Sequence, residues 1–197
     1  MNTNKKAALL KAAKELFGEH GYAETTFKKI SERAHVALGL LTHHYGTKEK
    51  LFLAAGLDVL EHFLSHLREG IQGAANGHEA VLLFCRAYLE FSIDANSHWL
   101  VLVRCSPYSD MKTKTDRDIM DSMFSEVPRL LETLIDRGIN DGSIRKNDSK
   151  ALAQVIIALM VGANRTRVLT PYAAPSLYED VLRFVDAAIR PHEGESA

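Results

Sequence analysis

The sequence has few of the residues on which several classes of protein depend. Its only cysteines are Cys85 and Cys105, too few for a disulfide framework and not spaced as a CxxC pair. The N-terminus shows no apolar signal-peptide core, and the most apolar later stretch, residues 155–163, is too short to span a bilayer. These features predict a soluble, cytoplasmic protein with no membrane partner.

Enzyme motifs are also missing. The chain contains no glycine-rich phosphate loop, no nucleophile elbow and no His-Glu-x-x-His helix, and therefore no predicted catalytic residue or cofactor. It also lacks the alternating pattern of a β-strand, whereas apolar residues recur at helical spacing along most of its length. We therefore expect an all-α protein that is not an enzyme, with a small helical enzyme as the least favoured alternative.

Neither sign of charge dominates the 197-residue chain, whose net charge is −1. The charge is divided unevenly, however. Residues 1–50 hold nine Lys or Arg and five Glu, a net +4, which leaves −5 for the remainder. A basic segment on an acidic body is typical of a protein that contacts nucleic acid through one end.

The stretch from Thr25 to Leu51 predicts two short helices and the start of a third. Phe27, Ile30 and Ala34 form one buried stripe, and residues 35–37 are a turn of the length that a helix-turn-helix requires. The second helix directs Leu41 and Tyr45 inward and presents outward a small, polar face with almost no carboxylates. Spacing alone is equally compatible with a plain helical hairpin. A helix of this size also fits the major groove of DNA.

The same stretch resembles the DNA-binding domain of the TetR (tetracycline repressor) family of bacterial transcriptional regulators. The resemblance covers about fifty N-terminal residues and rests on Thr25-Thr26, Ile30-Ser31-x-x-Ala34, Val36, Gly39-x-Leu41, His44-Tyr45 and Lys48-Glu49-x-Leu51. It departs from the family pattern at His35 in place of the turn glycine, Ala37 in place of a capping serine, and Thr42 in place of a tyrosine.

The resemblance implies an N-terminal three-helix helix-turn-helix domain in residues 1–47 and a helical effector-binding and dimerisation domain in residues 48–197. Together with the outward face, it implies DNA contacts from two sets of residues. Groove and first-helix contacts fall on Thr26, Lys28, Lys29, Leu38, Gly39, Thr42 and His43, and phosphate contacts on His44 and Lys48.

Apolar periodicity continues through the C-terminal part of the chain. It predicts a long helix from Lys48 to about residue 70, a helix over 79–95, a short one over 98–105 that Pro107 stops, one over 115–140 kinked at Pro128, and two final helices. The resemblance implies that the final two helices pair into a dimer, with these interface residues: Leu152, Ile156, Leu159, Ala163, Leu177, Val181, Phe184 and Val185.

The middle of the chain is rich in aromatic and sulfur-containing residues, which line small-molecule pockets but are also common in plain cores. In the TetR family this region holds the inducer. The predicted ligand-binding residues are Phe84, Tyr88, Phe91, His98, Trp99, Met120, Met123, Phe124, Met160 and Asn164.

These observations predict a repressor that binds palindromic operator DNA as a homodimer and is released by a small apolar or aromatic effector. The alternative is a helix-turn-helix regulator gated by metal or by thiol oxidation. For that alternative the candidates are the one-turn pair His62 and His66, and the group of Cys85, His98 and Cys105.

Overall fold

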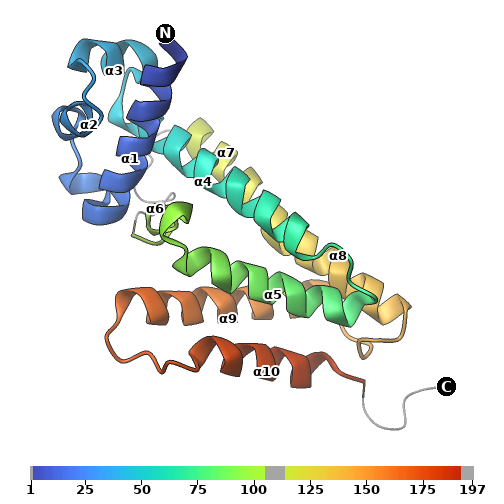
Figure 1. Cartoon of the computed structure of the whole chain (residues 1–197). Coiled ribbons are helices and arrows are strands. Elements are labelled where there is room, and N and C mark those ends of the chain that lie inside the picture. Colours follow the sequence, from blue (N-terminus) through green and yellow to red (C-terminus); the bar gives the residue numbers. More distant parts are fainter. Residues whose placement is uncertain (1, 105–113, 192–197) are drawn as a thin grey trace. The chain divides into compact units, whose positions relative to one another are not determined.

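All regular secondary structure is helical in residues 2–104 and 114–191, the part of the chain that the computed structural model describes (Figure 1). This confirms the all-α fold. Cys105 and Pro107, named above, lie outside these residues. The elements in chain order are α1 Asn2–Glu24, α2 Phe27–Arg33, α3 Leu38–Tyr45, α4 Lys48–Gly70, α5 Gly77–Ile93, the 3-10 helix η1 Ala95–Ser97, α6 Leu100–Arg104, α7 Lys114–Phe124, α8 Glu126–Asn140, α9 Ser149–Leu169 and α10 Leu177–Ile189.

The chain divides into two compact units. Unit 1 is formed by Met1–His62 and Asp94–Met123, and unit 2 by Phe63–Ile93 and Phe124–Ala197. Unit 1 therefore contains α1–α3, the first part of α4, and the later helices α6 and α7. Unit 2 contains the end of α4 together with α5 and α8–α10.

In unit 1, α1 buries one apolar face that includes Leu9, Ala13 and Phe17. The helix continues through Gly18 and is interrupted only at Gly21, where φ is 77° and glycine is the residue that adopts this conformation most readily. The Thr25 hydroxyl, fully buried, donates to the carbonyl oxygens of Leu16 (3.0 Å) and Gly21 (2.8 Å). This threonine therefore satisfies carbonyls at the end of α1 while the chain turns into α2.

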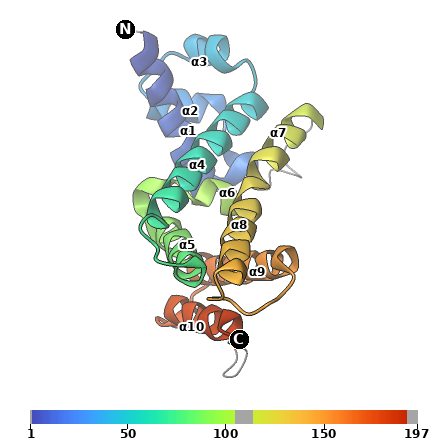
Figure 2. The same cartoon turned by 90° about the vertical axis from the view of Figure 1, so that its right-hand side faces the viewer.

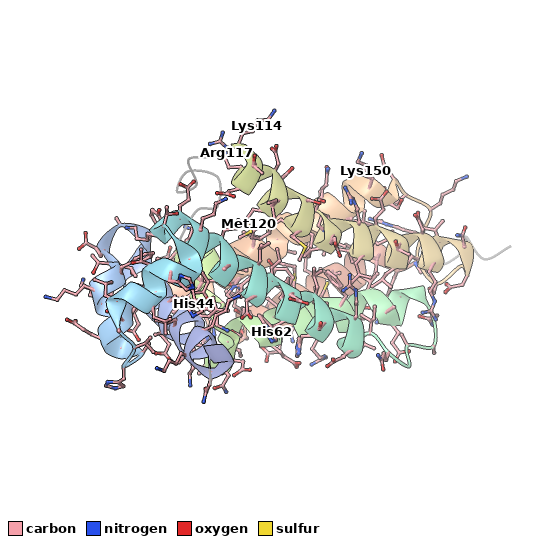
Figure 3. All side chains as sticks on the ribbon, turned by 90° about the horizontal axis from the view of Figure 1, so that it is seen from above. His44, His62, Lys114, Arg117, Met120 and Lys150 are labelled. Atoms are coloured by element: carbon pink, nitrogen blue, oxygen red, sulfur yellow. The ribbon has the colours of Figure 1, made fainter. Side chains whose placement is uncertain are left out.

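The first part of α4 packs closely against α7 inside unit 1. Met120 lies on the side of α7 that faces α4 (Figure 3), and a Cβ on Gly56 would overlap its terminal methyl group. Nearby, Lys50 Nζ lies 2.6 Å from the carboxylate of Asp116, which is completely buried. A buried carboxylate requires such a partner, because transferring an unpaired charge from water is costly.

The predicted helix over 115–140 is two helices in the structure, and the prediction of one kinked helix was wrong in this respect. The break falls at Ser125, three residues before Pro128. Pro128 has no N–H to donate, and its ring clashes with the carbonyl four residues earlier, that of Phe124. The helix therefore ends at Phe124 and restarts at Glu126, which puts Pro128 in the first turn of α8, where proline is tolerated.

In unit 2, α5, α9 and α10 lie in layers, and α8 packs against both α5 and α9 (Figures 1 and 2). The start of α5 meets the end of α8 so closely that a Cβ on Gly77 would overlap the backbone of Gly138. The Gly77 N–H also donates to the carboxylate of Asp141 at 2.8 Å. These contacts fix the position of the N-terminus of α5 against the C-terminal end of α8.

Helix α9 is long and apolar over much of its surface. By length and composition alone it could cross a membrane, yet only 28% of its most apolar window is buried inside the chain. Its inward stripe contains Ala153, Ile156, Met160, Ala163 and Asn164. A second apolar stripe on the same helix therefore faces away from the core.

Candidate functional site

Helices α2 and α3 form the two arms of the predicted helix-turn-helix. Thr26 caps α2, accepting a hydrogen bond from the Lys29 N–H at 3.2 Å, as its type and position suggested. Ile30 of α2 and Leu41 of α3 are completely buried. The turn is closed by the Val36 N–H, which donates to the Ser31 carbonyl at 3.0 Å.

The two departures from the family pattern within this turn have visible consequences. His35 adopts the left-handed conformation with φ 52°, a region that favours glycine. Ala37 begins α3 without any side-chain cap. The turn therefore forms although it has neither a glycine at the left-handed position nor a capping side chain at the start of α3.

The outer face of this motif is open and carries no carboxylate on α3. Leu38 is 47% exposed, and a Cβ on Gly39 would meet nothing within 4 Å. The structure exposes seven of the nine residues expected at the DNA, namely Thr26, Lys28, Lys29, Leu38, Gly39, Thr42 and His43. Since these residues lie on two consecutive helices and a helix can enter the major groove, the face has the form of a nucleic-acid interface.

The two residues expected on phosphate are placed differently. Lys48 is half-buried; its ammonium donates to the Tyr22 carbonyl at 3.0 Å and lies 4.3 Å from the centroid of the Tyr22 ring. His44 is also half-buried, and its Nε2 is covered and has no hydrogen-bond partner among the described residues. Both side chains thus contribute to the packing of the motif.

Ion pairs hold α1 against α2 behind this face. Arg33 contacts Glu15 at 3.3 Å and Glu19 at 3.0 Å. The hydrogen bond from Arg33 lowers the pKa of Glu19, and the bonds to both carboxylates raise the pKa of Arg33. The pairs are solvent-exposed, so they orient the helices more than they stabilise them.

The residues expected to bind an effector are divided between the two units. Unit 1 contains His98, Trp99, Met120 and Met123. Burial, and next the positive charge of Lys14, lower the pKa of His98, whose backbone is left-handed with φ 53°. His98 thus faces charged side chains of α1.

Unit 2 contains the other expected effector residues: Phe84, Tyr88, Phe91, Phe124, Met160 and Asn164. Phe63 anchors a cluster of rings there, with centroids 5.0 Å from Tyr88 and 5.1 Å from Phe91. The His66 ring lies 5.4 Å from Phe91. Burial raises the pKa of the Tyr88 hydroxyl, which therefore stays protonated and can donate a hydrogen bond.

The described residues give little support to the alternative in which the regulator is gated by metal or by thiol oxidation. They include no group of three or more His, Cys, Asp or Glu that could hold a metal ion. His62 Nδ1 instead lies 2.6 Å from the Asp58 carbonyl oxygen. Burial raises the pKa of Cys85 to about 12, which disfavours the reactive thiolate.

The residues expected at a dimer interface do not all face outward. Ile156, Ala163, Val181 and Val185 are buried within their own chain, whereas Phe184 is 63% exposed. Leu152, Leu159 and Leu177 are half-buried. Sequence reasoning missed the exposed apolar residues of α9, which include Val155 at 61% and Val161 at 41%. Because α9 is apolar on both faces, its sequence carries no signal that separates the inner from the outer stripe.

Comparison with known proteins agrees with this architecture. Residues 9–55 match the model of the family described as bacterial regulatory proteins, tetR family. The N-terminal part of the chain is therefore similar to the tetR family. The match spans most of α1, all of α2 and α3, and the first turns of α4, so it covers the helix-turn-helix and parts of the helices that support it.

The curated relatives of this chain are named as regulators. The uncharacterised HTH-type transcriptional regulator YhgD of Bacillus subtilis is 24% identical over 161 residues, 82% of this chain and 83% of the relative. The repressor AcnR of Corynebacterium efficiens is 41% identical over 51 residues, 26% of this chain and 27% of its own. The fatty acid metabolism regulator protein of B. subtilis is 24% identical over 149 residues, 76% and 75% of the two chains.

Solved structures share the fold along nearly the whole chain. A TetR-family regulator from Agrobacterium tumefaciens superposes with a TM-score of 0.82 at 17% identity, covering 97% of this chain and 100% of the other. AibR, solved in complex with isovaleryl coenzyme A and operator DNA, gives a TM-score of 0.76 at 17% identity, covering 95% and 98%. The likeness to these structures shows that this chain has their helical fold.

Proposed function

We propose that this regulator is a cytoplasmic repressor that binds a palindromic operator as a homodimer and leaves it when a small apolar molecule binds. The observation that carries the proposal is the exposed face of α2 and α3. It combines a capped first helix, a left-handed turn and a second helix free of carboxylates.

The DNA-binding part of the proposal rests on two kinds of contact. Lys28 and Lys29 lie exposed on α2 and can approach phosphates, which set position without reading sequence. Leu38, Thr42 and His43 lie exposed on α3 and can meet base edges in the groove. His44 and Lys48, which were expected on phosphate, are proposed to reach it only through their partly exposed edges.

The dimer part rests on the outer faces of α9 and α10. Val155 and Phe184 are largely exposed, and a Cβ on Gly162 would meet nothing within 4 Å, so a second helix could approach closely there. Exposed apolar stripes on adjacent helices indicate an association surface. A two-fold dimer presents two identical motifs, and half-sites lie about 34–36 Å apart or at a multiple of this spacing.

The effector part rests on the ring cluster of unit 2 and on what similar proteins bind. AibR was solved with an acyl coenzyme A and operator DNA, and another neighbour regulates fatty acid metabolism by name. We propose an apolar or acyl-bearing effector for this chain as well. The aromatic and methionine residues of the interior suit such a molecule.

The test begins with selection of binding sites from random DNA by the full-length protein. The proposal requires recovery of an inverted repeat, binding as a dimer, and release by at least one apolar compound from a screened collection. Recovery of no preferred sequence would overturn the operator assignment. Release by chelator or peroxide alone would replace the effector with the metal or thiol alternative.

A further inference from the structure

Asn164 is a polar residue in an unusual position. It lies on the inward stripe of α9 and is only 1% exposed. Neither its amide nitrogen Nδ2 nor its carbonyl oxygen Oδ1 has a hydrogen-bond partner among the residues that the structure describes. A carboxamide can donate two hydrogen bonds and accept two, so four bonding positions are unmatched there.

Such a side chain is costly to the ligand-free fold. Nearly all buried polar groups in folded proteins are hydrogen-bonded, and an unmatched one loses its hydration without compensation. An apolar residue of similar shape would avoid this cost, since Leu has the same branching as Asn. An unmatched buried amide at a functional site is therefore expected to meet a partner that is not part of the chain.

The level of Asn164 within unit 2 follows from a chain of contacts between three helices. The Arg167 guanidinium of α9 lies 5.7 Å from the centroid of the Tyr178 ring of α10, and the Tyr178 hydroxyl lies 2.9 Å from Ser92 Oγ of α5. Asn164 precedes Arg167 by about one turn, and Tyr88 precedes Ser92 by about one turn. Because α5 and α9 run in the same direction (Figure 1), Asn164 lies at the level of Tyr88 and the ring cluster.

No buried residue on α9 or on the helices packed against it is charged; the Arg167 side chain, one turn from Asn164, is exposed. The buried positions of α5, α8, α9 and α10 are all apolar or neutral; the polar ones among them are Tyr88, Ser92 and Asn164 itself. An ionised group would enter this interior without a counter-charge, which is strongly unfavourable. The matching ligand group is therefore neutral.

We infer that Asn164 is the polar contact of the effector site, and that the effector places a neutral amide-like or carbonyl group against it, with its apolar part among the rings of unit 2. An amide matches best, because its carbonyl accepts from Nδ2 while its N–H donates to Oδ1. A ketone or ester satisfies only Nδ2. This inference rests on the proposed effector-gated function and assigns the chemistry of that same site.

The first measurement uses Asn164→Leu without any ligand. The melting temperature of the ligand-free variant should exceed that of the parent, by about 2–4 °C, because the unmatched amide is removed. Leu131→Met, a volume-conserving swap of a buried residue on α8, serves as the control and should stay close to the parent. A fall in the melting temperature of Asn164→Leu would overturn the inference, since it would mean that the amide is already satisfied.

The second measurement uses three probes of similar length, namely octanamide, 2-nonanone and octanoate. With the parent protein, thermal stabilisation should be largest for octanamide, smaller for 2-nonanone and smallest for octanoate. In Asn164→Leu, octanamide should lose its advantage over the ketone, with affinity falling by about fivefold or more. Asn164→Ala, which removes the amide without adding volume, should show the same loss, so the result does not depend on how Leu packs.

Three outcomes would overturn the inference: the parent prefers octanoate, no probe stabilises the parent, or both variants keep the order seen with the parent. The failure of the proposed function is distinguished by operator binding. If an apolar compound releases the parent and both variants from DNA equally well, Asn164 is not the contact and the gated repressor stands. If no compound releases the parent, the gating proposal fails whatever the probes show.

Discussion

The helix-turn-helix and the interior of unit 2 place their candidate functional residues in opposite environments. Thr42 and His43 on α3 are exposed, and the motif is supported from behind by buried apolar residues. Tyr88 and Asn164 in unit 2 are almost fully buried, so the residues proposed to bind ligand also belong to the core. Substitutions on α3 should therefore change DNA binding without changing stability, whereas substitutions at Asn164 should change both ligand binding and stability.

The largest expected effect comes from the outer faces of α9 and α10. Val155→Glu combined with Phe184→Glu puts charges on exposed apolar positions and should give a folded monomer. Operator affinity should fall by about 100-fold or more, because each half-site is then bound separately. Analytical ultracentrifugation measures the oligomeric state, and gel shift measures operator affinity.

The control is Ile93→Glu, at an exposed apolar position on α5, which should remain dimeric. A double variant that remains dimeric would show that the interface lies elsewhere.

Thr42→Ala tests whether the exposed face of α3 reads bases. Operator affinity should fall by about fivefold, corresponding to about 1 kcal/mol, while affinity for random DNA and the melting temperature stay unchanged. Fluorescence anisotropy with operator and scrambled duplexes measures this. An equal loss of affinity for both duplexes would mean that Thr42 contacts the DNA backbone. It would also contradict the proposal that α3 contacts bases while α2 contacts phosphates.

Lys28→Ala tests the complementary role on α2. Affinity should fall by about threefold on operator and random DNA alike, and the slope of log affinity against log salt should become smaller by about one unit. Lys150→Ala removes the same charge from an exposed position on α9 in unit 2 (Figure 3) and should leave the slope unchanged. An unchanged slope for Lys28→Ala would contradict a phosphate contact.

A smaller effect is expected from the turn itself. His35→Gly removes a left-handed non-glycine residue and should raise the free energy of unfolding by about 0.5 kcal/mol, since relief of strain exceeds the added flexibility of the unfolded chain. Gly46→Ala, at φ 69°, makes the reverse change and should destabilise by about 1 kcal/mol. Chemical denaturation measures both, and a destabilised His35→Gly would mean that the imidazole makes a stabilising contact.

The smallest effect concerns acid and lies in unit 2. Hydrogen bonds from Ser143 and the backbone lower the pKa of Asp141 below its ordinary value. A carboxylate with a lowered folded-state pKa contributes stability above its unfolded pKa, near 4, and loses it as pH falls through the folded value. Asp141→Asn should thus flatten the decline of stability below about pH 4, as followed by circular dichroism. The exposed Asp136→Asn is the control, and an unchanged decline in Asp141→Asn would exclude this contribution.

Much of the helix-turn-helix could be predicted from sequence because its determinants are local. The caps at Thr26, Thr47 and Asp148 follow from residue type and position, and each accepts the expected backbone hydrogen bond. The left-handed turn at His35 was likewise expected from the motif. The face of α3 could be predicted because Leu41 on its other side has to be buried.

The remainder depends on contacts between distant segments. No local pattern indicates that the Lys48 ammonium binds the Tyr22 carbonyl, or that α9 directs Ile156 inward and Val155 outward. The expected effector residues were selected for their aromatic and sulfur content, a property that core and pocket share. Their division between the two units follows from the three-dimensional packing alone.

The contacts of Lys48 and Lys14 have a consequence for how a signal could travel. Lys48 holds the first turn of α4 to the end of α1, and Lys14 of α1 lies 2.6 Å from Asp58, nearly three turns further along α4. Helix α1 is thus bound to α4 at two points that are nearly three helical turns apart. A rotation of α4 would therefore rotate α1 with it. Because Arg33 binds α2 to α1, the helix-turn-helix would move as a rigid body, and α3 would change its orientation without changing its conformation.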